Sequence, residues 1–427
     1  MSATARLLSA LIAGALVGLL LGWMDPALAV EVADGVRPVG RLWLNALQMT
    51  VVPLVLALVV LSVSVTSDAA ASGRTARRAI AVFLVLLSAG ALFAVIAVPA
   101  LLSLIQPDPA LTAALNASEA AQTAPAPPTG WADALIAIIP SNPIAAAAQT
   151  AMLPLVVFAL FLGFALTRIE TDRRLQMVGF FQAIADAMIV IVRWVLWVAP
   201  VGIFALILDV TARSGLSILS ALGIYILLSC ALFLATTLLM VPVALLWGGE
   251  SIRRFTAAIL PAQAVAASTQ SSLASLPAML DIAERRLHYS PKVTALVLPM
   301  AVSLFRITSP MSYVTVALFI AWAYGVDLSW TQLAVAAALA VVVSLGSVGL
   351  PGTVTFMATN LPVAQALGLP IAPMALFMAV DTIPDIFATV GNVTADLTAT
   401  SVVAKANAGD DRDDAAARAA AATPPGP

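Results

Sequence analysis

The sequence contains little charge, one cysteine and one histidine, and each scarcity excludes a class of protein. Charged residues make up 10% of the 427, far below the roughly 25% of soluble domains, so a water-soluble protein is excluded. Cys230 and His288 are the only residues of their kinds, which excludes a disulfide framework and argues against a zinc site. No serine has a plausible His or Cys partner to activate it. We therefore expect a protein that is not an enzyme, with no cofactor, no firm metal site and no nucleic-acid partner.

Long apolar segments are abundant. Hydrophobic residues make up 62% of the chain and the mean hydropathy is +1.04. Because a helix needs about 20 apolar residues to cross a bilayer, the length leaves room for about eight crossings. We predict membrane-spanning segments at about 5–24, 42–66, 79–105, 175–210, 217–247, 293–323 and 371–403, with a broken segment at 131–166.

Two further apolar segments, about 255–280 and 331–369, are interrupted in the middle. The interruptions are the polar stretch 268–275 and the Gly/Pro stretch 346–352. Irregular backbone at membrane depth is tolerated where it lines a cavity, so we predict two re-entrant helical hairpins that mark a binding site. The alternative is a pair of ordinary kinked helices.

Basic residues fall in alternate connectors, which predicts an orientation in the bilayer. By the positive-inside rule both termini face the cytoplasm, and the cell membrane is expected to be a bacterial inner membrane. The tail from residue 406 to 427 is polar and of low complexity, and we expect it to be disordered. The basic residues concerned are Arg74, Arg77, Arg78, Arg168, Arg173, Arg174, Arg253, Arg254, Arg285, Arg286, Lys292 and Lys405.

The last predicted helix carries a polar stripe that packing does not explain. Asp381 and Asp385 are four residues apart, and Ala388, Thr389, Asn392 and Asp396 continue the same face. Ionisable side chains inside a bilayer are costly and usually functional. The stripe therefore predicts a solute or ion site; the alternative, a purely structural role in packing, is hard to reconcile with three carboxylates in a membrane helix.

Several motifs, taken in order, resemble the dicarboxylate/amino-acid:cation symporter family of the glutamate-transporter type. The resemblance runs from the first helix to Lys405. The motifs are Met49–Val55, Ser141-Asn142-Pro143, Leu153-Pro154, Ala199–Leu206, Ser275-Leu276-Pro277, Gly349-Leu350-Pro351-Gly352, Asn392–Thr400 and Val403-Ala404-Lys405.

This resemblance implies a fold and a domain division. The fold is an all-α membrane protein with eight transmembrane helices and two re-entrant hairpins, assembled as a homotrimer and working by an elevator mechanism. The resemblance assigns residues 1–66 and 131–212 to the scaffold. It assigns 78–105 and 217–405, with hairpins at 251–283 and 330–369, to the mobile transport unit, and leaves 406–427 as the tail.

The resemblance also assigns roles in substrate binding. Asp385 corresponds to the ligand of the substrate amino group, and Asn392, with Thr389 beside it, to the ligand of the main carboxylate. Family members that bind acidic substrates carry an arginine in the last helix, where this chain has Ala388. Since arginine recognises a carboxylate by two parallel hydrogen bonds, we expect a neutral solute. The backbones at the two hairpin tips, around Ser271 and Ser272 and around Gly349, would complete the site.

The ion sites depart from the family pattern as well. The family's Asn-Met-Asp-Gly-Thr motif is replaced by Phe305-Arg306-Ile307-Thr308-Ser309, and Leu84 and Leu87 replace a tyrosine and a threonine. Loss of oxygen ligands predicts that this sodium site is absent. A residual sodium site is possible at Asn392 and Asp396.

We predict that Arg306 pairs with Asp396 and replaces the sodium charge. The residues assigned to ion or charge coupling are Ser303, Arg306, Asp381 and Asp396. The coupling ion stays open between a proton, carried by Asp381 or Asp385, and residual sodium, and uncoupled exchange is a further possibility. The alternatives for the function are a sodium- or proton-coupled dicarboxylate symporter and a non-transporting sensor or anion-leak member of the same fold.

Overall fold

The computed structural model describes residues 3–71, 73–106, 109, 112, 138–346 and 352–421. Across these ranges the regular structure is helical, and they contain no strand. Seven helical stretches are long and apolar enough to cross a membrane. They are Ala5–Met24, Pro26–Asp68, Arg74–Leu102, Thr171–Trp197, Ser217–Leu246, Pro291–Tyr324 and Thr382–Ala408. The predicted all-helical membrane fold is thus confirmed.

The chain forms two compact units. Unit 1 comprises Met1–Val65, Ser88–Leu232 and Ser309–Asp385, and unit 2 comprises Thr66–Leu87, Phe233–Thr308 and Ile386–Pro427. The helices mainly of unit 1 are α1 (Ala3–Met24), α2 (Pro26–Gln48), α3 (Val51–Ala71), α7 (Pro143–Ala148), α8 (Met152–Leu166), α9 (Thr171–Trp197), α10 (Ala199–Ser214), α15 (Thr308–Tyr324), α16 (Trp330–Gly346), α17 (Gly352–Ala366) and α18 (Met374–Val380). Unit 2 holds α12 (Ile252–Thr269), α13 (Ser272–Asp281), the π-helix η1 (Ile282–Arg286) and α14 (Pro291–Leu304). Both units share α4 (Arg74–Leu102), α11 (Ser217–Leu246) and α19 (Thr382–Ala421).

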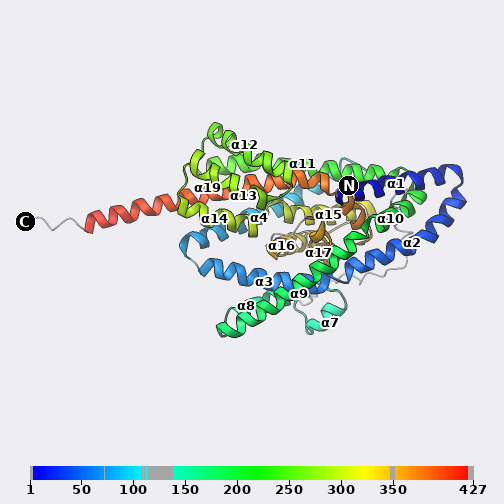
Figure 1. Cartoon of the computed structure of the whole chain (residues 1–427), viewed down its shortest axis with the longest axis horizontal. Coiled ribbons are helices and arrows are strands. Elements are labelled where there is room, and N and C mark those ends of the chain that lie inside the picture. The colour runs from blue at the N-terminus through cyan, green and yellow to red at the C-terminus, as the bar shows by residue number, and fades with distance from the viewer. Residues whose placement is uncertain are drawn as a thin grey trace, which may run out of the picture. The chain divides into compact units, whose positions relative to one another are not determined.

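Small residues let α1 approach α10 closely within unit 1. A Cβ atom on Gly14 would collide with the Ile207 side chain, and one on Gly18 would collide with Thr211. Glycines four apart put two backbones in contact where the bilayer offers no hydrophobic force between helices. Figure 1 shows α1, α2 and α10 side by side, and the three helices contact one another.

Four of the predicted spans are broken into two helices. The breaks lie at Met49–Thr50, at Val198, at residues 305–307 and at Asp381. Pro200 is the second residue of α10, where a missing N–H costs nothing because the first turn has no internal acceptor for it. At residue 305 the backbone leaves the helical region (φ −118°, ψ 84°), and α15 begins three residues later.

The predicted first hairpin is present as two helices joined by a tight turn. α12 packs against α13, and Gln270 between them adopts the left-handed conformation (φ 51°). The Ser271 side chain caps α13 by accepting a hydrogen bond from the Ala274 N–H at 3.2 Å. Entry of this hairpin into the bilayer stays a prediction.

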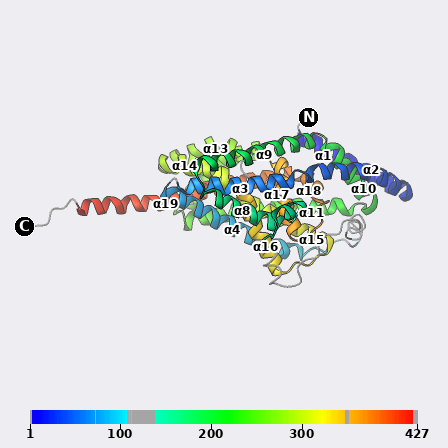
Figure 2. The ribbon, with the colours of Figure 1, turned by 90° about the horizontal axis from the view of Figure 1, so that it is seen from below.

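The second hairpin is described only in its two arms. α16 and α17 pack against each other, and α17 also contacts α8 and α18, as Figure 2 shows. The predicted tip around Gly349 lies outside the described residues.

The C-terminal helix runs further than the predicted boundary at Lys405. α19 continues to Ala421, into the segment for which the sequence predicted disorder. Its composition supplies a reason, because the stretch is rich in alanine, the residue with the highest helix propensity.

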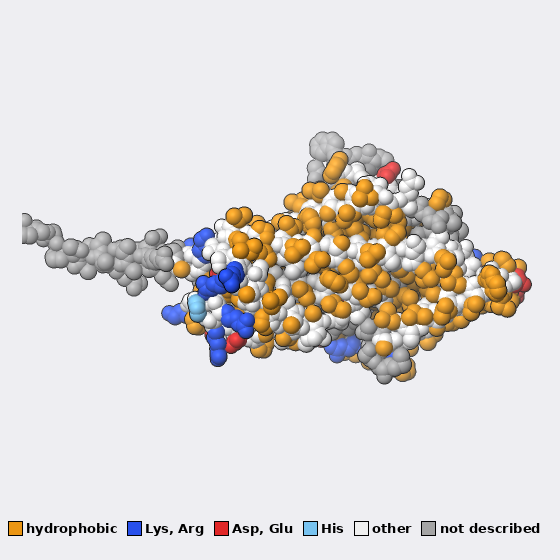
Figure 3. All heavy atoms as spheres, turned by 90° about the horizontal axis from the view of Figure 1, so that it is seen from above, with side chains coloured by type: hydrophobic (Ala, Val, Ile, Leu, Met, Phe, Trp, Pro, Cys, Tyr) orange, Lys and Arg blue, Asp and Glu red, His pale blue; other side chains and the backbone are white. Residues whose placement is uncertain are grey.

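The core of unit 2 lies between α12, α13, α14 and α19. Its fully buried side chains include Phe255, Ile259, Met279, Leu298 and Leu397. Hydrophobic side chains cover most of the face in Figure 3, whereas Lys and Arg side chains gather beside the one histidine. That distribution fits a chain whose apolar surface faces lipid and whose charged connectors face water.

Candidate functional site

The polar stripe predicted on the last helix lies on α19 and the turn before it. In unit 2, Thr389, Asn392 and Asp396 are 3%, 1% and 0% exposed. In unit 1, Asp381 lies between α18 and α19, and its carbonyl accepts a hydrogen bond from the Asp385 N–H at 2.9 Å. Both carboxylates are partly exposed, as is Ala388 on unit 2. The stripe is therefore accessible at its start and enclosed by protein further along.

Asn392 is held by the first residue of α15. Its Oδ1 atom accepts hydrogen bonds from the Thr308 N–H and the Thr308 hydroxyl, both at 3.0 Å. The close approach is possible because Gly391 has no side chain, and a Cβ there would come 3.0 Å from Thr308 Cγ2. Thr308 is thus a neighbour of a predicted site residue that sequence reasoning did not assign to the site.

Asp396 is buried without a hydrogen bond. Its side chain is 0% exposed, and neither carboxylate oxygen has a partner among the described residues. Arg306 lies in the break between α14 and α15. The predicted direct pair of Arg306 with Asp396 is therefore not present as a hydrogen-bonded ion pair. Ser303 lies nearby in sequence, in the last turn of α14, and is partly buried.

Hydrocarbon surrounds Phe305, at the position where the sequence predicts that a sodium site is absent. The rings of Phe83 and Phe305 stack with centroids 4.9 Å apart and planes inclined by 7°. Both rings and Leu87 are fully buried, whereas Leu84 is 37% exposed. A cation needs oxygen atoms to replace its water, and these side chains offer none, so they do not fit a bound sodium ion.

Tyr225 is a second neighbour that sequence reasoning missed. Its hydroxyl donates a hydrogen bond to Asp381 Oδ1 at 3.5 Å. The ring stacks on Phe377 with centroids 4.6 Å apart and contacts Phe319 at 5.6 Å. The sequence could have pointed to this residue only through its being the one tyrosine among the apolar residues of α11. A tyrosine in a membrane helix is more often a packing residue.

The first hairpin is tied to α19 by a polar contact. Gln263 on α12 donates a hydrogen bond from Nε2 to the Thr394 hydroxyl at 2.9 Å. Ser271 and Ser272 lie at the turn of the hairpin, partly exposed, with Ser271 acting as the cap of α13. This contact fixes the α12 arm against α19, the helix that carries Asn392.

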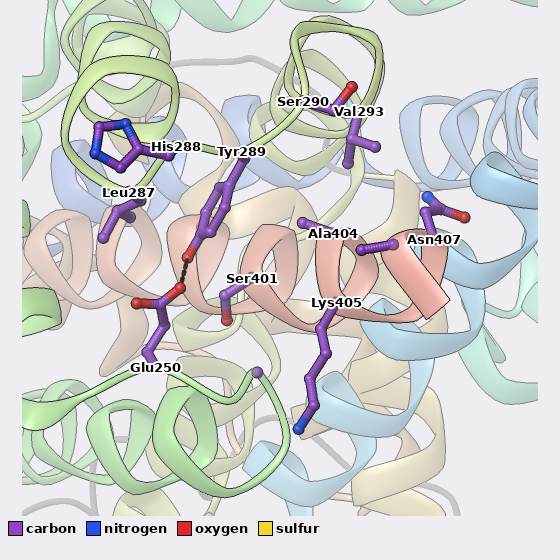
Figure 4. A pocket seen from close by; sticks show the side chains of 12 residues that line it. Glu250, Leu287, His288, Tyr289, Ser290, Val293, Ser401, Ala404, Lys405 and Asn407 are labelled. Atoms are coloured by element: carbon purple, nitrogen blue, oxygen red, sulfur yellow. Dashed lines mark hydrogen bonds between the residues drawn. The ribbon is translucent and has the colours of Figure 1, made fainter. Parts of the chain in front are cut away.

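A cavity of about 260 Å³ lies elsewhere in unit 2 and contains none of the predicted site residues. Glu250, Tyr289, Ser401 and Lys405 line it, as Figure 4 shows, and the Tyr289 hydroxyl donates a hydrogen bond to Glu250 Oε1 at 2.9 Å. Burial, reinforced by the negative charge of Glu250, raises the pKa of Tyr289. The phenol therefore stays protonated and remains a donor at physiological pH.

The described residues contain no group of three or more His, Cys, Asp or Glu side chains that could hold a metal ion. The carboxylates on α19 are instead spread along the helix in sequence.

Comparison with known proteins tests the family resemblance that the sequence motifs indicated. The model of the sodium:dicarboxylate symporter family matches residues 4–406. The chain is 28% identical to the proton/glutamate-aspartate symporter of Escherichia coli (strain K12), over 94% of this chain and 92% of the relative. It is 28% identical to C4-dicarboxylate transport protein 2 of Polaromonas naphthalenivorans (strain CJ2), over 92% and 86%.

A third relative comes from a mammal. The chain is 29% identical to neutral amino acid transporter B(0) of Oryctolagus cuniculus, over 91% of this chain and 77% of the relative. All three relatives are named as transporters or symporters. The resemblance inferred from the sequence motifs is thus confirmed, and the chain belongs to the sodium:dicarboxylate symporter family of membrane transporters.

Proposed function

We propose that this protein is a secondary active transporter of a small amino-acid-like solute with a neutral side chain. The observation that carries the proposal is Ala388, which stands on the stripe next to the buried Thr389. An alanine offers no donor to a second carboxylate, and an acidic solute would lose the bidentate pair that an arginine supplies.

The two ends of the solute would be bound by different residues. Asp385 is an acceptor-only carboxylate suited to an ammonium group. The Oδ1 atom of Asn392 accepts hydrogen bonds from Thr308. The amide N–H groups of Asn392 would therefore donate to a carboxylate of the solute. The hairpin tips around Ser271, Ser272 and Gly349 would add backbone amides, the kind of donor found at anion sites of helix ends.

Coupling to sodium at the family's third-helix and seventh-helix positions is proposed to be lost. The Phe83–Phe305 stack and the burial of Leu87 support this, since they put hydrocarbon where ligands would be needed. We propose that Arg306 supplies positive charge near Asp396 in place of an ion, by electrostatic attraction. A residual sodium site at Asn392 and Asp396, or a proton on Asp381 or Asp385, would then be the remaining route to coupling.

The proposed assembly and motion follow the family. The protein would be a homotrimer in which residues 1–66 and 131–212 form the scaffold. Residues 78–105 and 217–405 would move as an elevator with the solute. Both termini would face the cytoplasm, in keeping with the positive charge of the connectors that hold Arg253, Arg254, Arg285 and Arg286.

A dicarboxylate is the second candidate solute. It is favoured by the likeness to a C4-dicarboxylate transport protein, which covers 92% of this chain. The two candidates differ in the amino group, which only an amino acid can offer to Asp385, and in the second carboxylate, which only a dicarboxylate or an acidic amino acid carries.

A thermal-shift screen of the purified protein tests the proposal. Neutral amino acids, L-aspartate, L-glutamate, succinate and fumarate would be added singly, because a ligand that binds the folded state raises the unfolding temperature. We expect stabilisation by neutral amino acids only. Stabilisation by the dicarboxylates alone would contradict a neutral amino acid as the solute and support a dicarboxylate instead. Counterflow uptake into liposomes separates a transporter from a sensor, since a sensor would bind without uptake.

A further inference from the structure

Thr308 holds Asn392 at a point where the membrane segment is interrupted. The chain leaves α14 at Phe305 and enters α15 at Thr308. The first N–H groups of a helix have no internal acceptor, and here the Thr308 N–H finds its acceptor on another helix, at Asn392 Oδ1, 3.0 Å away. Both residues are almost completely buried, at 2% and 1% exposed. Asn392 therefore caps α15 from α19.

The two hydrogen bonds fix which way the Asn392 amide points. Oδ1 is an acceptor and Nδ2 a donor, so a half-turn of the amide would set Nδ2 against the Thr308 N–H. Two donors cannot bond each other, and the buried N–H would lose its partner, which is costly in an apolar environment. The observed orientation is thus enforced by Thr308.

The hydroxyl of Thr308 makes a second contact with Asn392. It lies 3.0 Å from Asn392 Oδ1 and 3.4 Å from the Ala388 carbonyl oxygen. A hydroxyl both donates and accepts, so beside a rotated amide it would accept from Nδ2 and donate to the Ala388 carbonyl. The backbone N–H of Thr308 is therefore the group that keeps the rotated amide unfavourable.

We propose that Thr308 is a positioning residue that orients Asn392 so that only its N–H groups face the solute, and so selects a carboxylate at that end. The inference deepens the proposed function, on which it rests. A site that presents only donors accepts a carboxylate, with its several acceptor positions, better than a carboxamide, which places a donor of its own against them.

The test compares L-alanine with L-alaninamide, which differ only in that group. Binding to wild-type protein and to Thr308→Pro and Thr308→Val would be measured by calorimetry. Proline removes the backbone N–H and is tolerated at the first position of a helix, whereas valine keeps the N–H and removes only the hydroxyl. We expect a preference for L-alanine of at least about tenfold in wild type and in Thr308→Val, reduced about threefold to tenfold in Thr308→Pro. An unchanged preference in Thr308→Pro overturns the inference.

Asn392→Asp distinguishes failure of the inference from failure of the proposed function. Aspartate keeps an acceptor for Thr308 and suits a helix N-terminus, but it has no donor for a carboxylate. We expect Asn392→Asp to lose L-alanine binding, and circular dichroism in detergent would check that the variant is folded. Wild-type binding by Asn392→Asp would remove Asn392 from the proposed site. Loss of binding there, together with an unchanged preference in Thr308→Pro, would overturn only the role of Thr308.

Discussion

The contacts of single side chains decide which carboxylates of the stripe can interact with cargo. The Oδ1 atom of Asp381 accepts a hydrogen bond from the hydroxyl of Tyr225. The Tyr225 ring packs against the rings of Phe319 and Phe377. Tyr225 is 1% exposed, so it cannot follow Asp381 if that carboxylate moves. The phenol therefore acts as a fixed donor that favours one position of Asp381.

Replacing Tyr225 by phenylalanine tests this contact alone. The ring stack survives and one hydrogen bond to a carboxylate is lost, which we expect to lower the free energy of unfolding by about 1 kcal/mol. We also expect slower net uptake with solute affinity unchanged within about twofold, because Asp381 is assigned to charge coupling. Uptake rates and binding would be measured on the same preparation.

Tyr225→Leu is the matched control for the stack. It removes the hydroxyl and the aromatic contact together, and we expect a further loss of about 1 kcal/mol. Equal losses of affinity and uptake rate in Tyr225→Phe would place Tyr225 in solute binding instead of charge coupling.

At the scale of residues, sequence reasoning identified the stripe but not what holds it. The four-residue spacing from Asp381 to Asp396 could be read directly, since it depends only on helix geometry. The roles of Tyr225, Gln263 and Thr308 could not, because each is defined by a partner 84 or more positions away in the chain. The Arg306–Asp396 pair was expected to be direct, and the structure leaves both Asp396 carboxylate oxygens without a hydrogen-bond partner among the described residues.

At the scale of elements, an ionic cluster fastens α2 to α10 in unit 1. Arg213 donates to Asp34 Oδ1 at 2.6 Å and to Asp209 Oδ1 at 2.8 Å, and Arg37 lies 3.7 Å from Asp209 Oδ2. The Asp209 side chain is 6% exposed. A carboxylate this buried depends on its partners to offset the loss of water.

Arg213→Met should destabilise the protein by about 2 kcal/mol, because Asp209 keeps only the distant Arg37. Arg173→Met is the matched control. Arg173 pairs with Glu170 at 3.5 Å, but both side chains are more than half exposed, and we expect a change below about 0.5 kcal/mol. Chemical unfolding in detergent would compare the two variants, and similar losses in both would contradict a role for burial.

The helical segments could be predicted better than their breaks. Mean apolar character located the seven stretches long enough to cross a bilayer, because a bilayer requires it. The interruptions at Met49–Thr50 and at residues 305–307 contain no glycine or proline to mark them, and one residue's departure from helical backbone barely changes mean hydropathy. Pro200, at the start of α10, was the exception with a readable signal.

At the scale of the whole molecule, the packing predicts how transport responds to ions. Uptake of a neutral amino acid by protein in liposomes should continue when sodium is replaced by choline if, as proposed, one sodium site is lost at the Phe83–Phe305 stack. We expect uptake rates in choline within about threefold of those in sodium. A difference of that size would correspond to a small coupling free energy between the solute and a residual sodium site. An absolute requirement for sodium would contradict this prediction, and a dependence on a pH gradient would identify the proton as the coupling ion.

The stacked rings also make a single substitution at position 305 costly. Asparagine introduced there alone would bury an unsatisfied amide beside Phe83 and leave a void where the second ring lay. We expect such a variant to be less stable than the native protein, so oxygen ligands could be introduced here only by coordinated replacements on α4 and after the end of α14. The aromatic contact therefore holds hydrocarbon at this point against single changes.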